Sequence, residues 1–128
     1  MLSNVVLHFR DGKVSKGTTE DFFPNKPSFH FKDMERPGNL VIPISSLKAV
    51  FFVKSYTGQP AYNERSDVDR AGFGRRIRVC FKDGEVQEGY TQGYSPGRPG
   101  FFVFPCDPQS NNERIFVISE ATEQIEFT

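Results

Sequence analysis

The sequence predicts an all-β fold made of two similar units, and three observations support this prediction. The chain contains 14 Phe, 11 Gly and 9 Pro, and aromatics favour pleated strands while Gly and Pro mark turns. Apolar residues alternate with polar ones in several short segments. A nine-residue pattern also occurs twice, as Phe9-Arg-Asp-Gly-Lys-Val-Ser-Lys-Gly17 and as Phe81-Lys-Asp-Gly-Glu-Val-Gln-Glu-Gly89. We therefore predict an internal duplication.

The first unit divides into five predicted strands. Residues 5–10 alternate in polarity and end at Asp11-Gly12, which is a strong hairpin signal. Residues 13–23 form the second predicted strand, in which Gly17 is expected to be a kink or bulge. The remaining strands are expected at 29–31, 40–44 and 49–53, with a short helical turn at 45–47. Pro43 suggests an edge or a strand end for the fourth strand.

The second unit repeats these features 72 residues later. Pro24 and Pro27 recur as Pro96 and Pro99, so the same turn is built twice. Around Asp107-Pro-Gln-Ser-Asn-Asn112 the second copy gains three residues, and the offset becomes 75. The polar segment between the copies is predicted to be a linker. Because units of this size bury little apolar surface alone, we expect the two to pack together.

The repeated unit resembles the small five-stranded barrels of SH3-like and Sm-like proteins. The first Sm motif is matched by Asp11-Gly12, Gly17 and Phe22, and again by Asp83-Gly84, Gly89 and Tyr94. The resemblance implies two tandem five-stranded SH3-like/Sm-like barrels, at residues 1–54 and 77–128, joined by a linker at 55–76. The Asp and Asn that build the Sm base pocket are not matched after Phe22 or Tyr94. The resemblance therefore implies the barrel and not Sm-type RNA binding.

The two-copy pattern also resembles an uncharacterised bacterial domain family. The similar stretches are Asp21-Phe-Phe-Pro-Asn-Lys-Pro27, Gly100-Phe-Phe-Val-Phe-Pro105 and Asn111-Asn-Glu-Arg-Ile-Phe-Val117. This family is associated with proteins that contain PilZ-type cyclic-dinucleotide domains. The resemblance implies a regulatory setting without an established activity.

Charge is balanced over the whole chain but not along it. Residues 1–54 carry 8 Lys/Arg and 5 Asp/Glu (+3), whereas residues 77–128 carry 4 and 8 (−4). The zero net charge argues against a dedicated nucleic-acid binder, which usually has a strongly basic domain. A basic half and an acidic half attract each other within one chain or head to tail between chains.

The sequence shows no catalytic, metal-binding or targeting signature. His8, His30, Cys80 and Cys106 are the zinc-capable side chains, and they lack the close pairs of a structural zinc site. We therefore expect no metal, no cofactor and no enzymatic activity. The start of the chain has no secretory signal pattern, and the longest apolar runs have strand length. We expect a protein of the bacterial cytoplasm with reduced thiols.

The leading functional expectation is a non-enzymatic interaction or regulatory module. Residues 49–53 and 101–104 are apolar on both faces, so something beyond one small barrel must cover them. Either the two units pack through these strands, or they form a surface for another protein or a second copy of the chain. A partner is expected to dock along an open strand edge or through exposed aromatics near Phe22, Phe23, Tyr94 and Phe102. No membrane contact is expected.

The alternative expectation is a site for an anionic ligand, either RNA or a cyclic dinucleotide. Arg presents a planar fork that pairs with phosphate. The candidates are Arg70, Arg75, Arg76 and Arg78, near the linker, with Lys26 and Arg98 in equivalent turns. The spacing does not match the Arg pattern of PilZ domains. Asp67 and Asp69 are interspersed in the linker, so a solvated linker is the favoured interpretation of these arginines.

Overall fold

The computed structural model describes residues 2–56 and 72–127, and this part of the chain is all-β, as predicted. Two short 3₁₀ helices, η1 Ile44–Ser46 and η2 Ser119–Ala121, precede the fifth and tenth strands. The strands are β1 Ser3–Phe9, β2 Val14–Thr19, β3 Ser28–Asp33, β4 Asn39–Pro43, β5 Leu47–Val53, β6 Arg75–Phe81, β7 Val86–Thr91, β8 Gly100–Pro105, β9 Asn112–Ile118 and β10 Thr122–Phe127.

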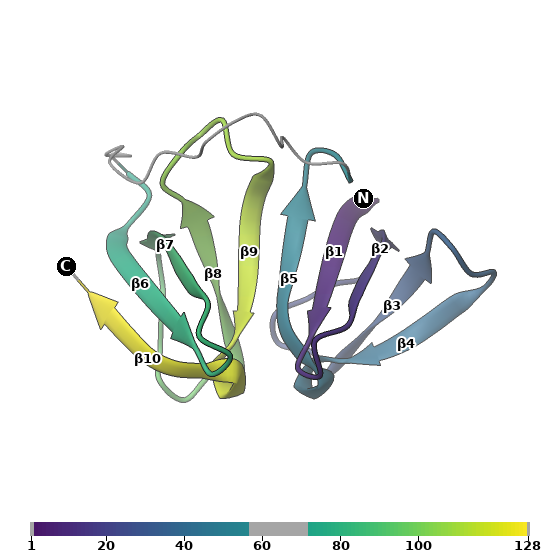
Figure 1. Cartoon of the computed structure of the whole chain (residues 1–128), viewed down its shortest axis with the longest axis horizontal. Helices are drawn as coiled ribbons and strands as arrows, with labels where there is room; N and C mark the ends of the chain where they lie inside the picture. The colour runs from purple at the N-terminus through teal and green to yellow at the C-terminus, as the bar shows by residue number, and fades with distance from the viewer. Residues whose placement is uncertain (1, 57–71, 128) are drawn as a thin grey trace.

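All ten strands belong to one open antiparallel sheet. Their order is β10-β6-β7-β8-β9-β5-β1-β2-β3-β4. Figure 1 shows β5 and β9 side by side in the middle, with β4 and β10 at the two outer ends. The two predicted tandem barrels are therefore not confirmed in that form. The fourth strand of the second half, β9, pairs with the last strand of the first half, β5, and this pairing fuses the halves into one sheet.

The internal duplication is confirmed at the level of strand register. In the first half Leu7 lies opposite Val50, and in the second half their counterparts Val79 and Ile125 lie opposite each other. The register shift next to His8 in the β1–β5 pair recurs in the β6–β10 pair. The pairs β1–β2, β2–β3 and β3–β4 recur in the same way as β6–β7, β7–β8 and β8–β9. The offsets of 72 and 75 thus describe two copies of one structure.

Gly17 is required by a close approach and not by the predicted bulge. A Cβ at Gly17 would collide with the backbone carbonyl of Lys32 on β3, and a Cβ at Gly89 would collide with that of Phe104 on β8. Each glycine therefore lets two neighbouring strands approach closely. The pairing of β1 with β2 keeps its register at Gly17. The register shift of the first half lies instead in the β1–β5 pair.

Several boundaries differ from the prediction, and three of them bear on the turns and the linker. The second strand ends at Thr19 and not at residue 23. At this strand end, Thr19 Oγ1 donates a 2.8 Å hydrogen bond to the carbonyl of His30. The helical turn begins one residue early, at Ile44, whose amide donates to the carbonyl of Pro27. β6 begins at Arg75, within the segment 55–76 that is predicted to be the linker. Residues 57–71 of that linker lie outside the described residues.

The apolar core runs through both halves without a break. Leu7, Val50 and Phe29 of the first half and Val79 and Phe116 of the second belong to one buried cluster. Such a shared core is expected because each half alone is too small to bury enough apolar surface.

Candidate functional site

The joint between the halves is the β5–β9 pair, and it is the most heavily buried part of the sheet. Val50 lies opposite Phe116, Ala49 opposite Val117, and all four side chains are fully buried. Because both strands carry apolar residues on both faces, neither could remain at an exposed edge without cost. β5 is one of the two segments predicted to be apolar on both faces. The other, residues 101–104, lies on β8, which pairs with β7 and β9 and not with β5.

An aromatic cluster closes one face of the joint. Phe22, from the turn after β2, packs edge-on against Phe116 at 5.0 Å between ring centroids, and lies 6.3 Å from Phe102. The guanidinium of Arg114 stacks over Phe52 at 4.3 Å and over Phe102 at 4.7 Å. Such contacts contribute beyond simple area burial. Aromatic side chains from both halves therefore stabilise the β5–β9 joint.

A cationic side chain crosses the other end of the joint. Lys48 on β5 is almost fully buried, and its Nζ lies 2.7 Å from Asp83 in the β6–β7 hairpin. The same ammonium donates to Glu85 and lies 4.7 Å from the centre of the Phe81 ring. Burial alone would lower the pKa of Lys48, but the hydrogen bonds that its ammonium donates to the two carboxylates outweigh burial and raise the pKa. The Lys48 hydrogen bond lowers the pKa of Asp83 correspondingly.

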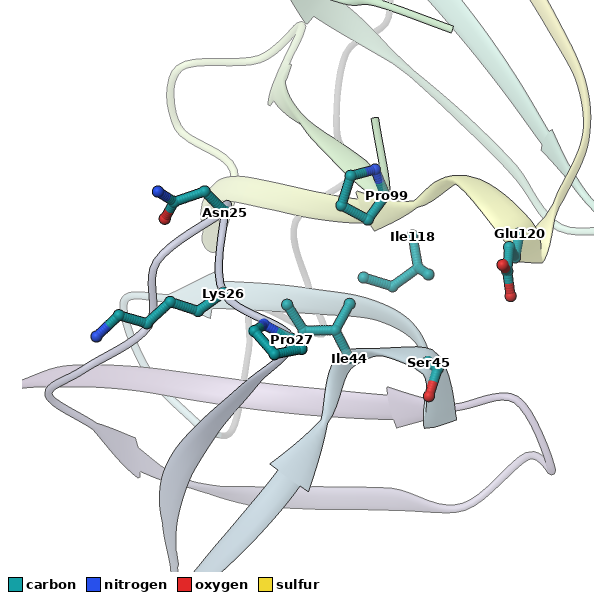
Figure 2. A pocket seen from close by; sticks show the side chains of 8 residues that line it. All are labelled: Asn25, Lys26, Pro27, Ile44, Ser45, Pro99, Ile118 and Glu120. Atoms are coloured by element: carbon teal, nitrogen blue, oxygen red, sulfur yellow. The ribbon is translucent and has the colours of Figure 1, made fainter. Parts of the chain in front are cut away.

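A pocket of about 310 Å³ lies beside the joint, at the end where the 3₁₀ helices are. Figure 2 shows Pro27 and Ile44 of the first half facing Pro99 and Ile118 of the second. Lys26 and Glu120 also line the pocket. Ser45 supplies the one hydroxyl of this lining, and no His accompanies it there to act as a base. The pocket therefore offers a small apolar depression and no recognisable catalytic arrangement.

The two end strands of the sheet are open edges within the described part of the chain. β4 is hydrogen-bonded only to β3, and β10 only to β6. On β4 the side chain of Val41 is 62% exposed and that of Leu40 is 40% exposed. Open edges are usually protected by charge or by cover, because they present unpaired backbone N–H and C=O groups. β4 therefore combines an open edge with exposed aliphatic side chains.

The predicted aromatic surface divides into two parts. Phe22 and Phe102 are half-buried in the cluster at the joint. Phe23 is exposed, and the ammonium of Lys26 lies 4.6 Å from its ring centre. Tyr94, the counterpart of Phe22, packs on Phe101 and Phe127 near the open β10 edge. The four rings therefore do not form one patch.

The predicted basic residues do not gather in one place either. Arg75 stacks on Phe127 at 4.1 Å, whereas Arg76 lies 3.7 Å from Glu88 and faces the other side of β6. Arg78 is exposed on β6, and Lys26 and Arg98 occupy equivalent turns in the two halves. Arg70 lies outside the described residues. Binding of an anion by these residues stays a prediction.

The histidines and cysteines occupy separate positions. His30 Nδ1 lies 2.6 Å from Asp21, and this hydrogen bond lowers the pKa of Asp21. No disulfide joins Cys80 and Cys106. Among residues 2–56 and 72–127, no three His, Cys, Asp or Glu side chains are grouped as metal ligands. Within the same ranges, no helix has the length and apolar character that crossing a membrane requires.

Sequence reasoning missed the residues that define the edge and the joint. The run Leu40-Val-Ile42 is apolar at consecutive positions on a short strand, which signals that both faces need cover. Lys48 had no such signal, because its carboxylate partners lie on a hairpin 35 residues away in the chain.

Comparison with known proteins places the chain in a family. A family of unknown function, DUF6982, matches residues 1–128. The chain belongs to this family. No match was found among curated proteins or among solved structures. Membership in DUF6982 therefore supplies no activity, and the function must be argued from the joint and the open edges. The associations with Sm-like and PilZ proteins stay predictions.

Proposed function

We propose that this DUF6982 protein is a non-enzymatic interaction module that binds a polypeptide by strand addition at the edge of its sheet. The observation that supports this most directly is β4. It pairs on one side only among the described strands, and it exposes Leu40 and Val41. An extended segment laid along such an edge gains main-chain hydrogen bonds, while the exposed side chains provide specificity.

The internal joint supports the same mechanism. The contact between β5 and β9 is an edge-to-edge pairing that buries apolar side chains and is closed by rings and by Lys48. The chain therefore already uses strand addition once, between its own halves. A second use at an outer edge requires no new kind of contact.

The finer description of the halves belongs to this proposal. We take each half to be a five-stranded Sm-like unit, supported by the Asp-Gly hairpin and the 3₁₀ turn found in both halves. We also place the protein in the bacterial cytoplasm, supported by two cysteines that form no disulfide.

Site-specific photo-cross-linking tests strand addition. A photoreactive amino acid replaces Val41 in the full chain, which is produced in bacterial cells and irradiated. The matched control places the same group at Val14, a valine that is 51% exposed on β2, away from either edge. We expect a protein–protein product from position 41 and none from position 14. Absence of a product at position 41, or equal products at both positions, would contradict the proposed function.

A further inference from the structure

We propose that copies of this chain assemble head to tail, with β10 of one copy hydrogen-bonded to β4 of the next. This inference rests on the strand-addition function proposed above and names its partner. β10 is the counterpart of β5, and β4 is the counterpart of β9. β5 and β9 pair inside the chain, whereas their counterparts β10 and β4 are the two end strands of the sheet. Each copy therefore has one strand of each type without a partner on its outer side among the described strands.

The internal joint defines the register of the proposed contact. Val50 lies opposite Phe116 in the joint, and their counterparts are Ile125 on β10 and Val41 on β4. The neighbouring pairs follow from the same offsets of 75. They are Gln124 with Ile42, Ile125 with Val41, Glu126 with Leu40 and Phe127 with Asn39. A contact between two different surfaces repeats from copy to copy and ends only when a ring closes.

The exposure of the edge residues fits this register. Val50 and Phe116 are fully buried in the joint, whereas Val41 is the most exposed of all the large hydrophobic side chains described. Ile125 is half-buried on β10. A second copy at this register covers the two side chains with each other, as Val50 and Phe116 are covered inside the chain.

The aromatic cluster of the joint also has an incomplete copy at the β10 edge. Phe22 packs within its own half on Phe29 and Phe52, and its counterpart Tyr94 packs likewise on Phe101 and Phe127. Phe22 additionally contacts rings across the joint, at Phe102 and Phe116. The counterparts of these two rings are His30 and Val41, which lie at or beside the open β4 edge. In the assembly, Tyr94 of one copy therefore packs on Val41 and His30 of the next.

Charge supplies an independent argument. Inside the chain, Lys48 pairs with Glu85 across the joint. The counterpart of Lys48 is Glu123 and the counterpart of Glu85 is Lys13, so both members of the pair are reversed in sign. A Glu123–Lys13 pair between copies therefore keeps the attraction of the Lys48–Glu85 pair. The Lys48–Asp83 contact has no such equivalent, because Asp11, the counterpart of Asp83, keeps its negative charge and lies 3.9 Å from Lys13 in its own copy. The net charges of residues 1–54 (+3) and 77–128 (−4) favour the same head-to-tail order.

Light scattering after size-exclusion chromatography tests the assembly with the full chain over a wide range of concentrations. We expect a mass above the 14.6 kDa of one chain, which increases with protein concentration. Val41→Lys should raise the dissociation constant at least about tenfold, because its ammonium would lose water beside Ile125. The matched control Val14→Lys should leave the mass unchanged. A wild-type monomer at every concentration, or an assembly that Val41→Lys does not weaken, would overturn the inference.

A charge swap tests the register without changing any apolar residue. Glu123→Lys and Lys13→Glu should each weaken assembly by about threefold or more, because each places like charges at the contact. The double variant recreates the internal arrangement of Lys48 with Glu85 and Asp83, with Asp11 in the place of Asp83, and should restore at least the wild-type affinity. Single variants that weaken assembly without rescue in the double variant would overturn the proposed register. Circular dichroism of each variant shows whether it is folded.

The photo-cross-link at position 41 separates this inference from the proposed function. A product with residues 124–126 of a second copy supports both. A product with a different polypeptide, and none with a second copy, overturns self-assembly and leaves strand addition standing. No product at all contradicts strand addition itself.

Discussion

At the scale of single residues, Lys48 is the clearest case of a side chain held by both halves. Its ammonium is removed from water and depends on two carboxylates that remain about half exposed. A buried charge that loses its partners is costly, whereas replacing the charge itself by an apolar group costs little. Removal of the two carboxylates should therefore reduce the free energy of unfolding more than removal of the Lys48 charge itself.

The double variant Asp83→Asn/Glu85→Gln should destabilise the protein by about 2 kcal/mol, because it leaves the Lys48 ammonium buried with neutral partners. Asn at position 83 retains a side-chain oxygen that can accept the hydrogen bond from the backbone N–H of residue 85. Lys48→Met should cost about 1 kcal/mol or less. Urea unfolding measures both, and Asp11→Asn in the equivalent hairpin is the matched control, with a change below about 0.5 kcal/mol. A larger loss for Lys48→Met than for the double variant would contradict this account.

His8 makes the stability depend on pH. Burial lowers the pKa of His8, and nearby Lys48 adds to this, while Glu85 and Asp83 oppose it. With the folded-state pKa below the unfolded value of about 6.5, the unfolded chain binds more protons in the window below that value. The contribution of His8 is therefore complete above about pH 7 and is lost as the pH falls.

The expected result is a free energy of unfolding that decreases from pH 7.5 to pH 5.5. His8→Phe should reduce this slope, since it keeps a ring against Phe51, which lies 4.4 Å from His8. Urea titrations at the two pH values measure the slope. An unchanged slope in His8→Phe would assign the pH dependence to another group.

At the scale of the elements, much of the fold could be predicted and the joint could not. Alternating polarity and the Asp-Gly turns located the strands of each half, because these are local signals. The pairing of β5 with β9 is not local. Residues 49–53 and 101–104 signalled that both faces need cover, yet periodicity does not say which strand supplies it. Basic residues were grouped by their nearness in sequence, but alternation along β6 sends Arg75 and Arg76 to opposite faces.

The repeated aromatic positions allow a comparison within one molecule. Phe22→Ala should cost about 3 kcal/mol, because Phe22 contacts rings of both halves. Tyr94→Ala should cost less, about 2 kcal/mol, in a dilute solution, because Tyr94 contacts only its own half among the described residues.

Urea unfolding at low protein concentration measures the difference. The comparison is internally controlled because the two positions are counterparts in the repeat. Equal losses would mean that the contacts of Phe22 across the joint contribute nothing to stability.

At the scale of the whole molecule, the duplication explains why the sheet remains open. β5 pairs with β9 inside the chain, whereas their counterparts β10 and β4 lie at the two ends of the sheet with one open edge each (Figure 1). Exposed Leu40 and Val41 are then features of an unfilled contact and not defects of an isolated sheet. We therefore expect these outer edges to form backbone hydrogen bonds with another strand.

Hydrogen exchange of the full chain, followed by mass spectrometry as a function of protein concentration, tests this claim most directly. Strand addition protects backbone amides, whereas docking through side chains does not. We predict that the amides of β4 and β10 are protected at high concentration and lose protection together on dilution, while β5 and β9 stay protected throughout. Concentration-independent exchange of β4 and β10, with β4 as fast as the exposed turns, would contradict the account.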